Sequence, residues 1–214
     1  MTTHHAAVRA SYDTVAAGYA DALADDLAAR PVDRAMLAVF AELAGHGPVG
    51  DLGCGPGRVA AHLRELGRTD VLGVDLSPAM IAEARRRHPG PRFEVGSIDR
   101  LSFVADGELA GAIAWYSIIH TPRELVPALF AEFRRVVRPT GPLLLAFQAT
   151  TPSTPATVRV ERAYGHGGLS LDAYRWDPAV VTDLLADAGF RPHTTAVRQP
   201  EAPEKVPQAY LLVV

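Results

Sequence analysis

The sequence predicts an α/β fold with a doubly wound, mostly parallel sheet and helices on both of its faces. From residue 49 onward, short apolar runs alternate with longer amphipathic segments, which is the pattern of strands joined by crossover helices. A glycine-rich turn follows the first apolar run, and an aspartate ends the second. A length of 214 residues fits one domain around one core, so we expect residues 1–214 to fold as a unit.

The first expected element is an alanine-rich helical arm over residues 1–44, which is broken at Pro31 and carries Tyr12 and Tyr19 in its first half. Five strands and three sheet-covering helices are expected after it. The strands are expected near 48–52, 70–74, 91–95, 110–116 and 142–148. The apolar stripes of the helices are Val59, Leu63 and Leu66; Leu125, Leu129, Phe133, Val136 and Val137; and Val180, Val181, Leu184, Leu185 and Ala188.

Helix starts are predicted where a capping residue precedes proline, because proline suits the first helical position. These pairs are Ser77-Pro78, Thr121-Pro122 and Asp177-Pro178, and Thr121 with Glu124 also has the pattern of a capping box. The stretch 149–176 is rich in Thr, Pro, Gly and aromatic residues, and we interpret it as a lid insertion over a ligand site. Residues 177–214 are expected to form a helix and a closing pair of strands, 190–197 and 207–214.

Composition excludes several classes of protein. Hydrophobic residues make up 48% and charged residues 21% of the chain, as in ordinary globular proteins. No apolar run approaches the roughly 20 residues of a membrane helix, and the first residues lack the apolar core of a secretory signal, so we expect a cytoplasmic protein without a membrane partner. A net charge of −3 gives no general attraction to nucleic acid, and the scattered histidines lack the spacing of metal ligands.

The glycine-rich turn predicts a nucleotide-like ligand. Glycines at 53, 55 and 57 leave bare backbone for a ligand to approach, and Cys54 between them is small enough to pack there. Asp75 follows about 20 residues after the first glycine, which is the spacing of a carboxylate that binds ribose hydroxyls. A nicotinamide dinucleotide satisfies the same geometry, but its loop usually reads Gly-x-Gly-x-x-Gly. Asp51 should place a carboxylate in the loop mouth, where it would repel pyrophosphate and attract a sulfonium or ammonium group.

Three segments resemble the class I S-adenosylmethionine-dependent methyltransferases, especially their small-molecule, ubiquinone-biosynthesis-like branch. The segments are residues 51–57, 74–80 and 134–145, and the resemblance covers about residues 10–200. It implies a Rossmann-like, seven-stranded sheet whose last strand is antiparallel, with a cofactor-binding core at 45–148. It also implies S-adenosylmethionine as cofactor and methyl transfer to an oxygen or nitrogen of a small organic metabolite.

The resemblance assigns roles to residues of this chain. It places the methionine part of the cofactor against the loop, the ribose on Asp75, and the adenine beside Leu76 and Met80. The loop set is Asp51, Gly53, Cys54, Gly55 and Gly57. Ser97 stands where the family usually has aspartate, so the adenine amine could be met by Ser97, by backbone near Ile98, or by Asp99.

Aromatic residues complete the expected cofactor site. Trp115 and Tyr116 are expected to form a wall of the cofactor site. Tyr12 and Tyr19 resemble the arm tyrosines that close over the cofactor in this family, with ordinary amphipathic packing as the alternative. Four residues are candidates for acceptor binding: Gln148, which ends the fifth strand, and Tyr164, His166 and Tyr174, which lie in or beside the insertion. The alternative is that they pack within the lid.

His120 is the candidate catalytic residue. It lies just before Thr121 at the carboxyl edge of the sheet, where a helix N-terminus would disfavour imidazolium and keep a neutral general base. The alternative is a histidine that only hydrogen-bonds the loop. Two other functions fit the same pattern, a nicotinamide-dependent oxidoreductase and a protein that binds S-adenosylmethionine without turnover.

Overall fold

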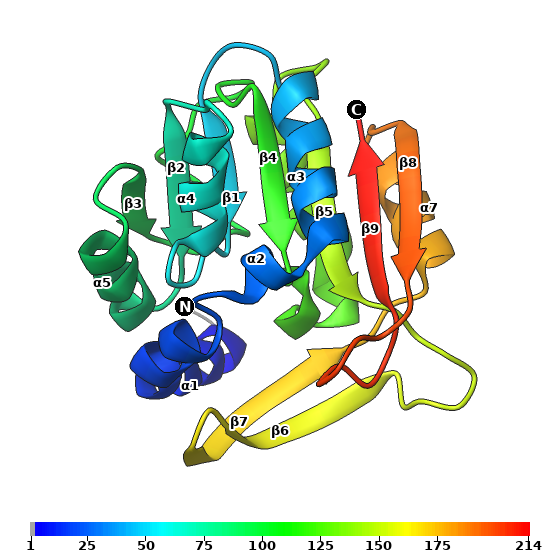
Figure 1. The fold of residues 1–214 in the computed structure, drawn as a ribbon. Coiled ribbons are helices and arrows are strands. Elements are labelled where there is room, and N and C mark those ends of the chain that lie inside the picture. The colour runs from blue at the N-terminus through cyan, green and yellow to red at the C-terminus, as the bar shows by residue number, and fades with distance from the viewer. Residues whose placement is uncertain (1–2) are drawn as a thin grey trace.

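A computed structural model describes residues 3–214 and contains a seven-stranded sheet with the order β3-β2-β1-β4-β5-β9-β8 (Figure 1). The strands are β1 (Val49–Leu52), β2 (Val71–Asp75), β3 (Arg92–Val95), β4 (Gly111–Trp115), β5 (Leu143–Gln148), β8 (Pro192–Arg198) and β9 (Gln208–Val213). The first five pair in parallel, and β9 runs antiparallel to both β5 and β8. The doubly wound fold with an antiparallel last strand is therefore confirmed.

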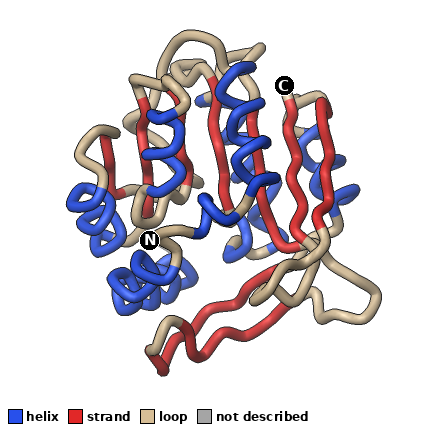
Figure 2. Tube along the Cα trace, viewed as in Figure 1, coloured by secondary structure: helices blue, strands red, loops and turns tan. Residues whose placement is uncertain are grey.

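Helices cover both faces of this sheet (Figure 2). Helices α3 (Pro31–Leu43), α4 (Arg58–Glu65) and α5 (Pro78–Arg87) pack on one face through apolar residues such as Phe40 and Leu63. Helices α6 (Val126–Val136) and α7 (Pro178–Asp187) pack on the other through Phe133 and Leu185. The sheet is thus buried on both sides, as its nearly continuous apolar strands require.

Three residues of the predicted apolar stripes are exposed. Leu66, Leu125 and Val180 keep 37%, 41% and 46% of their surface accessible. Leu66 and Leu125 lie just outside their helices, and Val180 is in the first turn of α7, so none of them reaches the sheet.

The predicted helix start at Thr121-Pro122 is wrong. Pro122 has a ψ of 140°, which keeps the chain extended, and Thr121 makes no side-chain cap. Two short 3-10 turns, η1 (Ile118–His120) and η2 (Arg123–Leu125), occupy this stretch, and α6 begins only at Val126. The caps at Ser77 and Asp177 are confirmed, since each side chain accepts a backbone N–H of its helix.

The arm is three helices. Long α1 (Thr3–Ala22) is followed by the short α2 (Asp26–Ala29), and Pro31 is the first residue of α3. Residues 149–176 contain an antiparallel hairpin of β6 (Thr157–Ala163) and β7 (His166–Tyr174). Helix α1 lies between this hairpin and the lower edge of the sheet (Figure 1). None of the helices within residues 3–214 combines the length and apolarity needed to span a membrane.

Candidate active site

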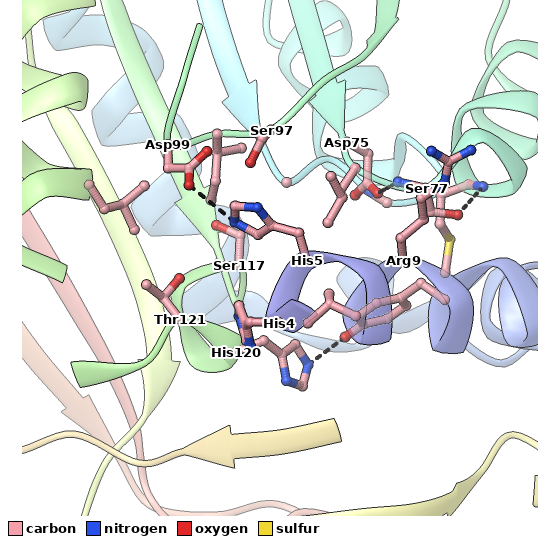
Figure 3. A pocket seen from close by; sticks show the side chains of 18 of the residues that line it. His4, His5, Arg9, Asp75, Ser77, Ser97, Asp99, Ser117, His120 and Thr121 are labelled. Carbon is pink, nitrogen blue, oxygen red and sulfur yellow. Dashed lines mark hydrogen bonds and ion pairs between the residues drawn. The ribbon is translucent and has the colours of Figure 1, made fainter. Parts of the chain in front are cut away.

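A cavity of about 220 Å³ lies where β1, β2 and β4 end, and α1 closes it from below (Figure 3). This is the point where strand order reverses in the parallel sheet, which is where ligands bind in open α/β folds. Its lining residues are His4, His5, Val8, Arg9, Tyr12, Tyr19, Gly53, Gly55, Asp75, Leu76, Ser77, Met80, Ser97, Ile98, Asp99, Trp115, Tyr116, Ser117, His120, Thr121, Leu125, Ala128 and Leu129.

Two glycines present bare backbone to this cavity. Gly53 and Gly55 have φ angles of +82° and +52°, which side chains rarely tolerate. A Cβ on Gly53 would lie 2.3 Å from the Cβ of Ser117, so no larger residue fits there. Gly57 also has a positive φ, but it begins α4 and faces Phe93 behind the loop instead of the cavity.

Asp75 joins the loop to the start of α5. One carboxylate oxygen accepts the Gly55 N–H and the other accepts the Ser77 N–H, both at 2.8 Å. Burial raises the pKa of Asp75, and these hydrogen bonds partly oppose the rise. The carboxylate is therefore fixed at the end of β2 with further lone pairs available to a ligand in the cavity.

The expectation that Asp51 sits in the loop mouth is wrong. Asp51 is a fully buried residue of β1, and one of its carboxylate oxygens accepts the Ala60 N–H of α4 at 3.0 Å. Burial raises its pKa to about 7. Cys54 is likewise buried, beside Gly73 of β2. Both residues support the loop from behind, and neither lines the cavity.

The predicted adenine and cofactor-wall residues do meet in the cavity: Leu76, Met80, Ser97, Ile98, Trp115 and Tyr116. Asp99 also lines it, but its carboxylate pairs with His5 of α1 at 3.1 Å. Trp115 Nε1 and Ser117 Oγ are buried without a hydrogen-bond partner. A bare glycine loop, a buried carboxylate and two unpartnered polar atoms together fit a ligand such as S-adenosylmethionine, which carries ribose hydroxyls and other polar groups.

One face of α1 forms the opposite wall. His4, Val8 and Tyr12 are spaced four residues apart and therefore lie above one another on the helix. Only the two tyrosines of α1 were predicted from sequence, although this spacing is visible there. Thr121 and the first turn of α6, which supplies Ala128 and Leu129, also line the cavity and were not predicted.

His120 is held by both of its ring nitrogens. Nδ1 lies 2.8 Å from the backbone oxygen of Asp172 in β7, and Nε2 lies 2.8 Å from the hydroxyl of Tyr12. A carbonyl oxygen can only accept, so we assign the proton to Nδ1, which leaves Nε2 to accept from Tyr12. Burial lowers the pKa of His120, so the ring is neutral because it is desolvated and not, as predicted, because it precedes a helix.

Asp13 anchors the arm to the cofactor side of the cavity. Its carboxylate accepts the Ser77 hydroxyl at 2.6 Å and the Ala79 N–H at 3.2 Å. These donors belong to the N-terminal turn of α5, where a negative charge is favourable. Asp13 could not be predicted from sequence because its partner lies 64 residues away in the chain.

The predicted acceptor residues lie elsewhere. Tyr164, at the hairpin turn, contacts Tyr19 edge to face, with ring centroids 4.8 Å apart. His166 is exposed, Tyr174 packs partly buried against the core, and Gln148 pairs with Gln208 in the sheet. None of the four lines the cavity. Among residues 3–214 no group of three or more His, Cys, Asp or Glu side chains is placed to hold a metal ion.

Comparison with known proteins gives consistent matches. Residues 49–141 match a family model described as a methyltransferase domain. A demethylmenaquinone methyltransferase of Beutenbergia cavernae is 34% identical over 133 residues, which are 61% of this chain and 47% of that protein, so the chain spans about half the length of this relative. An N-demethylindolmycin N-methyltransferase of Streptomyces griseus is 27% identical over 189 residues, 78% of this chain and 79% of that one.

The fold is also similar to solved structures. The 1,6-didemethyltoxoflavin-N1-methyltransferase of Burkholderia thailandensis, solved with 1,6-didemethyltoxoflavin and S-adenosylhomocysteine, superposes with a TM-score of 0.75 at 19% identity, covering 100% of this chain and 90% of that one. The magnesium protoporphyrin IX methyltransferase of Synechocystis superposes with a TM-score of 0.73 at 18% identity, covering 100% and 97%.

Proposed function

Because the chain belongs to the class I S-adenosylmethionine-dependent methyltransferases, we propose that it transfers a methyl group from S-adenosylmethionine to an oxygen or nitrogen of a small organic molecule. The observation that carries this proposal is the meeting of the bare loop at Gly53 and Gly55, the Asp75 carboxylate and the arm in one cavity. The cofactor supplies an electrophilic methyl group on a sulfonium, so alignment and exclusion of water provide much of the rate.

Each part of the cofactor has residues of suitable chemistry. Asp75 would accept both ribose hydroxyls, and the loop backbone at Gly53 and Gly55 would face the methionine part. Leu76 and Met80 would pack beside adenine, whose amine would be met by Ser97 or backbone near Ile98. Asp99 is the weakest of the three candidates for that amine, because its carboxylate already pairs with His5.

The acceptor would bind at the other end of the cavity. Apolar residues of α1 and α6 also line the cavity, and Tyr12, His120 and Thr121 supply hydrogen-bonding groups. This combination suits an organic molecule of modest size. The N-demethylindolmycin N-methyltransferase named above is, by its name, an N-methyltransferase, which supports a nitrogen acceptor for this chain. His120 would take the proton that the acceptor loses.

The two other functions can be separated from this one by binding and turnover. Calorimetry with S-adenosylhomocysteine tests the cofactor, and quenching of NADH fluorescence tests the nicotinamide alternative. We expect saturable binding of S-adenosylhomocysteine and no quenching of NADH fluorescence.

Turnover is then tested by incubating the protein with a metabolite extract and methyl-labelled S-adenosylmethionine. Mass spectrometry should find labelled product that is absent without protein. Tight cofactor binding with no labelled product across broad extracts would favour a binding protein over an enzyme.

A further inference from the structure

We propose that Tyr12 is a catalytic residue, which touches the acceptor and passes its proton to His120. The proposal rests on the proposed methyltransferase function and adds a second residue to it. It follows from the hydrogen bond between the two side chains, both of which line the cavity.

The geometry leaves His120 no free nitrogen for an acceptor. Nδ1 donates to the Asp172 carbonyl, and Nε2 accepts the Tyr12 hydroxyl, each at 2.8 Å. His120 keeps only 9% of its surface accessible, whereas Tyr12 is half-buried and lines the cavity from α1. His120 also lines the cavity, but the Tyr12 hydroxyl occupies its Nε2, so this hydroxyl is the group that an acceptor approaching Nε2 would meet.

The chemical character of both groups suits this arrangement. Burial raises the pKa of Tyr12 well above its ordinary value, so the phenol stays neutral and keeps a proton to give to Nε2. Burial lowers the pKa of His120, so the imidazole is unprotonated at neutral pH and can receive that proton. Tyr12 also contacts the ring of His120 edge to face, with centroids 5.4 Å apart, which fixes the pair's orientation.

The step balances in atoms and charge. A lone pair of the acceptor oxygen or nitrogen forms a bond to the methyl carbon, and the carbon–sulfur bond breaks with its electrons going to sulfur. The acceptor's proton moves to the Tyr12 oxygen while the Tyr12 proton moves to Nε2 of His120. One positive charge thus leaves the sulfonium and appears on the imidazolium, which later loses its proton to solvent.

The groups around His120 can stabilise the transient imidazolium. From β7, the Asp172 carbonyl accepts Nδ1–H, and the Asp172 carboxylate acts on the ring electrostatically, although it is itself paired with Arg159 at 3.0 Å. From α1, Tyr12 faces Nε2, and His4 lies close enough to disfavour a second positive charge. Protonation of His120 is therefore favoured by β7 and opposed by His4 and burial, which suits a temporary proton acceptor.

Three variants test the proposal. Tyr12→Phe keeps the ring and removes the hydroxyl. His120→Gln keeps one donor and one acceptor for the neighbouring groups, but it cannot take up a proton. Thr14→Ala changes an exposed residue one half-turn along the same helix and is the matched control. Each is assayed with methyl-labelled S-adenosylmethionine and a metabolite extract, and its affinity for S-adenosylhomocysteine is measured by calorimetry.

We expect the rate of label transfer to fall about 100-fold in both Tyr12→Phe and His120→Gln, the usual effect of losing a general base. The double variant should be no slower than either single one, because the two residues act as one unit. The wild-type rate should decline as pH falls through the lowered pKa of His120, and both variants should lose this decline. Affinity for S-adenosylhomocysteine should change less than threefold, and Thr14→Ala should match the wild type.

The outcomes separate this proposal from the proposed function. A Tyr12→Phe enzyme within threefold of the wild-type rate would overturn the relay while leaving methyl transfer standing. Full activity of His120→Gln would show that the pair only holds the arm, and would also overturn it. Wild-type protein that binds S-adenosylhomocysteine but transfers no label would overturn the proposed function, and the relay with it.

Discussion

Replacing Asp75 with asparagine should weaken binding of S-adenosylhomocysteine without unfolding the protein. Both carboxylate oxygens accept backbone N–H groups, from Gly55 and Ser77, each at 2.8 Å. Asparagine has only one acceptor oxygen, so its NH₂ group would face one of these donors. The loop and the ribose site would both lose their charged acceptor.

The size of the effect follows from these contacts. Hydrogen bonds to a charged group contribute about 1.5–3 kcal/mol, which corresponds to a Kd increase of about 10- to 150-fold. Calorimetry with S-adenosylhomocysteine measures it, and circular dichroism checks the fold. Asp70→Asn is the matched control, because Asp70 is an exposed residue just before the same strand. A folded Asp75→Asn protein with a Kd within twofold of the wild type would refute the reasoning.

Three further predictions concern the loop, the strand behind it and the arm. Gly53→Ala should lower the melting temperature and abolish S-adenosylhomocysteine binding, because its Cβ would lie 2.3 Å from Ser117. Gly67→Ala is the control, because Gly67 has a similar φ with open space around it, and the change should cost only the backbone strain of about 1–2 kcal/mol. Equal melting temperatures of the two variants would contradict this prediction. Burial raises the pKa of Asp51 to about 7, so folding favours its protonated form, and the free energy of unfolding should fall as pH rises toward about 7 and change no further above it because of this residue. Urea unfolding of Asp51→Asn should show a weaker fall of this free energy over the same range. An unchanged slope would count against the assignment. Asp13→Ala should release α1 from the start of α5, because it removes the hydrogen bonds to Ser77 and Ala79. Losing roughly 1.4 kcal/mol of hydrogen-bond energy should speed hydrogen exchange in residues 3–22 by about tenfold. Unchanged exchange would show that the arm is held by packing alone.

The cofactor side of the site was predictable from sequence because it is local. Gly53, Gly55 and Asp75 lie at strand ends, and the alternation of strands and helices is enough to bring them together. Asp51 was misplaced because the same sequence does not reveal that its carboxylate turns from the loop toward the Ala60 N–H of α4.

The acceptor side depends on contacts between distant segments. Tyr12 and His120 are 108 residues apart, and their hydrogen bond requires α1 to dock under the sheet. The hairpin was expected to bring Tyr164 and His166 to the acceptor, but it packs on the outer side of α1 instead. No periodicity in the sequence specifies which face of an arm will be covered by which neighbour.

The position of α1 as a middle layer sets the order of events in a catalytic cycle. Its residues Val15 and Ala16 share one apolar cluster with Met80 of α5 and Leu169 of β7. A shift of α1 would therefore break contacts with both neighbours, so we expect any ligand exchange that requires such a shift to be slow. Release of S-adenosylhomocysteine should then be slower than methyl transfer itself, and the first turnover should appear as a burst before the steady rate.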